Sequence, residues 1–113
     1  MKENNTTYPT RIAIPTNNGT TIYRGMLGRA KIIHIYVIDE SGDIRFAEER
    51  VNPYSETMQH LKTLDVYDLL KDCSIIISDN IGKKGIDRLQ NRGMELIFRQ
   101  GSIQDALKIF RKE

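Results

Sequence analysis

The stretch that most constrains the fold is residues 73–86, CSIIISDNIGKKGI. Its three consecutive isoleucines are β-branched and favour a strand. Because this apolar run does not alternate with polar residues, we expect a short strand covered on both faces. The run breaks at Asp79 and Asn80, and the residues that follow predict a turn and then a helix. Such a junction places free N–H groups and the positive end of a helix at the strand's carboxyl tip. We therefore expect a ligand edge here.

Composition restricts the class of protein. The 113 residues fit one domain, and 39% hydrophobic and 28% charged residues are ordinary for a soluble globular protein. A net charge of +2 does not argue for a nucleic-acid partner. The single cysteine indicates a reducing compartment, and no apolar run approaches the roughly 20 residues that span a membrane. We expect a cytoplasmic protein with no membrane or nucleic-acid partner, with a polar tail at residues 1–10 and one domain at 11–113.

Hydrophobic patterns and turn residues predict the order of the elements. Apolar runs predict strands at residues 11–15, 31–39, 44–51, 74–78 and 94–98. Periodic apolar residues and capping residues predict helices at 64–71, 83–92 and 102–111. Two hairpins place the first three strands side by side, and right-handed crossovers place the last two strands parallel to the first.

These connections give an α/β fold. We predict a three-layer α/β/α domain of ribonuclease H-like topology, with a mixed five-stranded sheet of order 3-2-1-4-5 and strand 2 antiparallel. The last helix should lie alone on its face. All strands except the second then end at one edge of the sheet, the usual ligand edge of an open α/β sheet. The loops that we expect to meet there are 15–30, 52–57, 78–83 and 98–103.

This topology raises the question of an enzymatic function. Two-metal phosphoryl chemistry requires clustered carboxylates, typically with one on the first strand. That strand reads RIAI and has none, and Asp79 alone cannot hold two metal ions. With only two histidines, we find no convincing nucleophilic grouping. We therefore expect a non-enzymatic binding protein.

Six short motifs occur in order along residues 11–111: IAIP (12–15), GRA (28–30), NP (52–53), LKDC (70–73), IG (81–82) and GSIQDA (101–106). On these motifs the chain resembles the nitrogenase iron–molybdenum cofactor biosynthesis family, small carriers of the cofactor or of its iron–sulfur precursor. The resemblance implies a carrier role, with cofactor-assembly or nitrogenase proteins as partners. The family usually has histidine and phenylalanine before Gly-Arg-Ala, where this chain has Met26 and Leu27. A thioether is a softer and weaker ligand than the histidine it replaces.

The predicted site combines cations, glycines and helix starts at the common edge. Arg24, Arg29 and Lys83 would attract a bulky anion, while the helix starts at Gly82 and Ser102 would supply N–H groups. The predicted cofactor-binding residues are Asn17, Asn18, Arg24, Gly25, Met26, Gly28, Arg29, Asn80, Gly82 and Lys83, and the predicted metal ligands are Met26 and His60. The same features suit a phosphate, so a binding module for an anionic metabolite or nucleotide is the alternative. A protein-interaction domain is a third class.

Several of these residues also have a purely structural interpretation. Met26 could fill a gap in the core, and Arg29 could bond loop carbonyls. Lys83 and Lys84 could simply be solvated. We expect Cys73 to be a small buried apolar residue and His34 to be packed or hydrogen-bonded within its strand.

Overall fold

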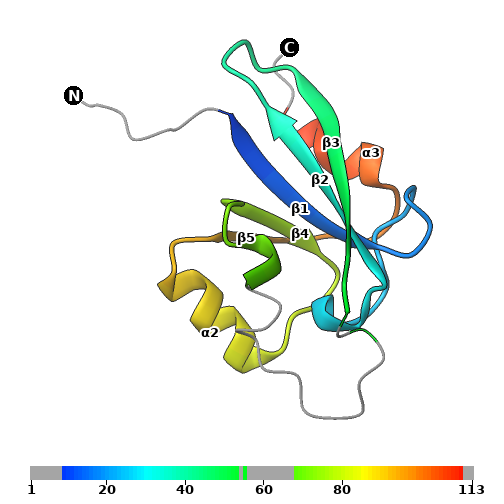
Figure 1. The fold of residues 1–113 in the computed structure, drawn as a ribbon, viewed down its shortest axis with the longest axis vertical. Coiled ribbons are helices and arrows are strands. Elements are labelled where there is room, and N and C mark those ends of the chain that lie inside the picture. The colour runs from blue at the N-terminus through cyan, green and yellow to red at the C-terminus, as the bar shows by residue number, and fades with distance from the viewer. Residues whose placement is uncertain (1–8, 54, 56–67, 111–113) are drawn as a thin grey trace.

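The computed structural model describes residues 9–53, 55 and 68–110, which form a sheet with helices on both faces (Figure 1). The strands are β1 (Thr10–Thr16), β2 (Ile32–Ile38), β3 (Ile44–Val51), β4 (Ile75–Ser78) and β5 (Glu95–Phe98). The helices are η1 (Leu27–Arg29), α2 (Lys83–Asn91), α3 (Ile103–Leu107) and η2 (Lys108–Phe110). Of the helix expected at 64–71, only 68–71 lie within the described residues: 68–70 are helical and Lys71 is in a turn.

The sheet has the predicted order, β3-β2-β1-β4-β5. β2 is antiparallel to both β1 and β3, while β4 is parallel to β1 and β5. The strand order, the mixed sheet and the antiparallel second strand are thus confirmed. β1, β3, β4 and β5 consequently end at one edge of the sheet.

Each face of the sheet carries its own apolar cluster, because successive side chains of a strand point to opposite faces. Ile76 packs with Leu89 of α2 on one face, whereas Ile75 and Ile77 pack with Ile103 of α3 on the other. All four residues of β4 are buried, which confirms a strand covered on both faces. Burial of each such isoleucine contributes about 1.5–3 kcal/mol, so this strand anchors the junction that follows it.

The two helices that flank the site differ in length and in how they begin. α2 runs nearly as predicted, and Gly93 follows its end with φ +86°, the conformation that favours glycine there. α3 is shorter than predicted: it ends at Leu107, and the 3₁₀ turn η2 continues to Phe110. Figure 1 shows α3 on the side of the sheet away from α2. Among the described residues, no helix has the length and apolarity that crossing a membrane requires.

Candidate functional site

Loops from distant parts of the chain meet at the carboxyl edge of the sheet, as the topology predicts. The N–H of Leu27 donates to the carbonyl of Asn80 (2.9 Å), so the 24–30 loop lies along the end of β4. The buried side chain of Asn52 donates to the carbonyls of Gly28 (3.0 Å) and Ala30 (2.8 Å). These bonds hold the 24–30 loop between the ends of β3 and β4.

The loop before α3 joins the same edge but leaves few donors for a ligand. The N–H of Ile103 donates to the carbonyl of Thr20 (2.9 Å), and Ser102 accepts from the N–H of Asp105 (2.9 Å). The N–H of Ala106 bonds the carbonyl of Ser102 (3.2 Å). The expectation that the Ser102 helix start offers its N–H groups to a ligand is therefore wrong, because the chain itself accepts most of them.

The start of α2 is different, because its first-turn donors remain open. The helix is preceded by Gly82, which has no side chain to cap it, and its first internal bond is from Ile86 to Gly82 (2.9 Å). Within the described residues, the N–H groups of positions 83–85 have no acceptor. The first turn contains no acidic residue and instead carries Lys83 and Lys84. Cations at the positive end of a helix are unfavourable, so this terminus is electrostatically unbalanced unless an anion lies nearby.

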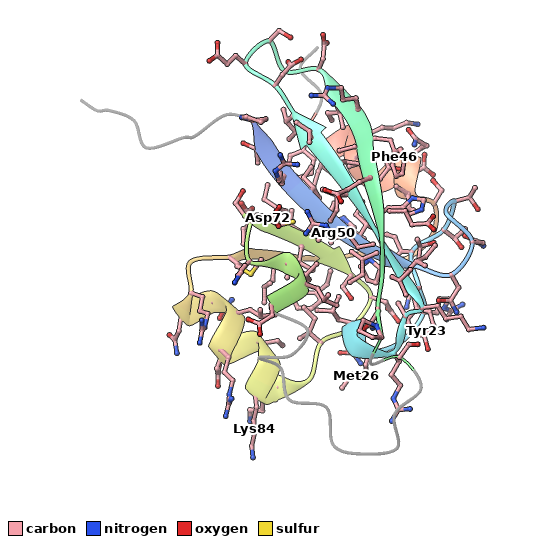
Figure 2. All side chains as sticks on the ribbon, in the orientation of Figure 1. Tyr23, Met26, Phe46, Arg50, Asp72 and Lys84 are labelled. Atoms are coloured by element: carbon pink, nitrogen blue, oxygen red, sulfur yellow. The ribbon has the colours of Figure 1, made fainter. Side chains whose placement is uncertain are left out.

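Met26 lies over this helix start. A β-carbon built at position 82 would be 3.2 Å from Cε of Met26, so a side chain there would require Met26 to shift slightly. The Met26 side chain is 40% exposed, so it does not fill a gap in the core. Figure 2 shows Met26 and Tyr23 at the same end of the molecule as Lys84.

The predicted cations belong to the two segments that meet here, the 24–30 loop and the start of α2. Arg24, Arg29 and Lys83 are exposed, and none of their side chains has a hydrogen bond or ion pair within the described part of the chain. Among the described residues, no loop carbonyl accepts a hydrogen bond from the Arg29 side chain, so that alternative interpretation of Arg29 is wrong there. Gly25 lies between Arg24 and Met26 with φ +137°, a conformation that L-residues rarely adopt.

The predicted polar contacts are less available than the cations. The side-chain oxygen of Asn17 accepts from the N–H of Lys31 (2.8 Å), and that of Asn18 accepts from the N–H groups of Thr20 and Thr21 (both 2.9 Å). Asn80 is exposed and bridges to Met26 through the backbone. His60 lies outside the described residues.

The described residues contain no group of three potential metal-ligating side chains among His, Cys, Asp and Glu. Cys73 is buried, as predicted, and burial raises the pKa of its thiol to about 12, so it is not a ready thiolate ligand. His34 is also packed and hydrogen-bonded as predicted: its Nε2 lies 3.0 Å from Glu49 and its ring 4.8 Å from that of Phe46. What the edge offers is positive charge, N–H donors and one thioether, a set suited to holding an anionic cargo by electrostatics.

A pocket lies away from this edge, between the β2–β3 hairpin and α3. It has a volume of about 170 Å³ and is lined by Tyr36, Ile44, Phe46, Gln104 and Leu107. Phe46 and Met26 lie toward opposite ends of the molecule in Figure 2. None of the described residues that line this pocket is charged, so they offer nothing that would attract an anion.

Sequence reasoning missed how the edge is held together. Asp79 accepts from the N–H of Gly25 (2.8 Å) and from the side chain of Gln100 (2.8 Å), and so joins three loops. The only sequence signal was an acidic residue directly after the central strand. From that signal the position of Asp79 in the fold could be predicted, but its hydrogen-bond partners could not.

Comparisons with known proteins agree with this fold. In solved structures, the chain is similar to PH0822 (TM-score 0.71, 21% identity, 89% of each chain). It is also similar to a candidate NifB protein from Thermotoga (TM-score 0.59, 23% identity, covering 89% of this chain and 86% of that one). A third is a candidate dinitrogenase from Methanocaldococcus jannaschii (TM-score 0.63, 15% identity, 92% and 89%). At these identities the similarity shows the fold alone.

Among curated proteins, none is significantly similar in sequence. The sequence profile of the family described as dinitrogenase iron–molybdenum cofactor matches residues 9–113, which covers nearly the whole chain. The resemblance drawn from the six motifs is thereby confirmed. The chain belongs to the dinitrogenase iron–molybdenum cofactor family.

Proposed function

We propose that this protein is a small, non-enzymatic cytoplasmic carrier that binds the iron–molybdenum cofactor or an iron–sulfur precursor cluster at the carboxyl edge of its sheet. Arg24, Arg29 and Lys83 supply the positive charge, and the first turn of α2 supplies N–H donors. The partners that deliver or receive the cargo are cofactor-assembly or nitrogenase proteins. Membership of the family supports the kind of cargo, and the geometry of the edge supports its place.

The observation that carries this proposal is the unbalanced start of α2. Two lysines occupy a first turn that contains no acid and has no side-chain cap. An anion there would accept the open N–H groups and neutralise the lysines at once, so its binding removes an unfavourable arrangement. The side chains of Arg24 and Arg29, which are exposed and form no ion pair with any residue that the structure describes, extend the same positive field over the neighbouring loop.

Met26 gives the site a preference among anions. Its exposed thioether lies over the start of α2, where a sulfur-rich anion would gain a soft contact that an oxyanion would not. A thioether bonds metals weakly, so the charges contribute most of the binding and Met26 adjusts selectivity. Met26→Ala should therefore weaken binding less than charge reversal at Arg29.

The alternative is a binding module for an anionic metabolite or nucleotide. Open N–H groups at a helix start bind phosphates as readily as they bind other anions. The two functions differ in the role of Met26: a phosphate gains nothing from a thioether, so its affinity should be indifferent to Met26→Ala.

Anaerobic titration with the isolated cofactor, followed by visible absorption, tests the proposal. Arg29→Glu should abolish tight binding, whereas Arg45→Glu, the same charge change on β3, should leave it nearly unchanged. Tight binding of ATP or phosphate by a wild type that ignores the cofactor would establish the alternative. Equal losses in Arg29→Glu and Arg45→Glu would show that net charge, and not this edge, determines binding.

A further inference from the structure

An acidic residue, Asp79, lies at the same edge of the sheet as the proposed site. Asp79 follows β4 directly and is half-buried. Its Oδ2 accepts from the N–H of Gly25 and its Oδ1 from Nε2 of Gln100, both at 2.8 Å. These donors are 54 and 21 residues away in the chain. A single carboxylate thus joins the tip of the central strand to two loops.

The bond to Gly25 fixes the part of the loop that presents Arg24 and Met26. Gly25 has φ +137°, and a β-carbon there would lie 3.0 Å from the ring of Tyr23. The chain therefore bends sharply between two proposed ligand contacts, and Asp79 holds the N–H at the bend. The bond from Leu27 to Asn80 (2.9 Å) tethers the loop only after the bend.

The charge of Asp79 has no evident use at this edge. Both of its recorded partners are neutral donors, and Arg24, Arg29 and Lys83 form no ion pair with it in the described part of the chain. A negative charge beside an anion site also opposes the ligand. The two acceptor oxygens of the carboxylate are directed at two loops, and this geometry therefore explains the presence of Asp79 better than its charge does.

We propose that Asp79 is a positioning residue that sets the Arg24–Met26 segment for anion capture, at the expense of some electrostatic attraction. The identity of the ligand rests on the proposed function. The clamp, by which we mean the two hydrogen bonds that Asp79 accepts from the two loops, does not. Its geometry and its charge are separable. Asparagine at position 79 can accept from Gly25 and donate to the oxygen of Gln100 once that amide flips, so both bonds survive without the charge.

Two variants of Asp79 should therefore change the affinity for the cofactor in opposite directions. Asp79→Ala removes both bonds, so the amide hydrogen of Gly25 should exchange about tenfold faster or more, and the cofactor should bind more weakly. Asp79→Asn should keep the slow exchange of Gly25. It should also bind the isolated cofactor more tightly, because the variant lacks the negative charge that repels an anionic ligand. For a separation of about 8 Å in water, the affinity should rise about two- to threefold for each unit of ligand charge.

Hydrogen exchange by NMR on the protein alone, followed by anaerobic titration with the cofactor, provides the test. The amide of Leu89 in the core reports global stability, and Asp79→Leu, which has a similar shape but no acceptor, serves if Asp79→Ala does not fold. Faster exchange confined to Gly25 in Asp79→Ala, with wild-type exchange in Asp79→Asn, is the expected result. Unchanged Gly25 exchange in Asp79→Ala, or equal effects in the two variants, would overturn the clamp. Failure of wild type to bind the cofactor would instead refute the proposed function and leave the exchange result to decide on Asp79.

Discussion

Reversing one charge at the start of α2 should make the protein more stable and a poorer anion binder. Lys84 lies in the first turn of α2, four residues before Arg88, and both are exposed. Lys84→Glu replaces an unfavourable cation at the positive helix end by a favourable anion, a change of about 1 kcal/mol. It also gives position 84 an opposite-charge pair with Arg88 four residues on but a like-charge pair with Asp87 three residues on, and these two changes of up to about 0.5 kcal/mol each largely cancel.

The expected gain is therefore about 1 kcal/mol in the free energy of unfolding at low salt, or about 4 °C in Tm for a domain of this size. Urea unfolding at low and at high ionic strength measures it. High salt should remove most of the gain, because screening acts on exposed charges. Lys84→Gln should give roughly half the gain.

A control of opposite sign is available in Lys108, at the C-terminal end of α3, where it pairs with Asp105 (3.1 Å). Lys108→Glu should lower stability slightly, since a cation is favourable at that end. The cofactor titration completes the test: Lys84→Glu should bind more weakly although it is more stable. Absence of any stabilisation, or a gain that persists in high salt, would refute the view that α2 begins in an electrostatically unbalanced state.

Three further predictions concern the scaffold. Arg50 holds the pKa of Asp72 at about 2, below its ordinary value, so the pair should stabilise the fold above about pH 4 and lose this effect as the pH falls toward 2. For a half-exposed carboxylate this amounts to about 1 kcal/mol, and urea unfolding of Arg50→Met should lack that pH dependence. Because the pKa of Cys73 is about 12, its thiol should resist alkylation at pH 8 until urea unfolds the protein; rapid native labelling would contradict this. Gly25→Ala should cost about 1–3 kcal/mol, measured by urea unfolding, and a neutral substitution would argue against the strained bend.

The sequence predicts the parts of the structure that depend on local pattern and connection rules. The isoleucine run, its abrupt polar end and the glycines after it correctly gave β4, the turn and α2. Strand order followed because hairpins and right-handed crossovers leave few arrangements. The convergence of loops at one edge came with that order.

Contacts between distant segments could not be predicted in this way. Both Nη groups of Arg50 donate hydrogen bonds to the carboxylate of Asp72 (both 2.8 Å), which is 22 residues away in the chain. Figure 2 shows the two side chains together. Nothing in either local sequence indicates this partner. The helix start at Ser102 fails as a ligand donor for the same reason, because Thr20 accepts one of its N–H groups from the far end of the chain.

Amide chemical shifts during titration with tetrathiomolybdate would show whether the start of α2 and the 24–30 loop bind a sulfur-rich anion. This diamagnetic, sulfur-rich molybdenum anion allows NMR detection at the site and resembles the proposed cargo in charge and softness. The largest shifts should occur at the amides of residues 83–85 and 25–29, with smaller ones for molybdate, which lacks sulfur. Shifts centred on Tyr36 and Phe46, or no saturable shifts at residues 83–85, would contradict it.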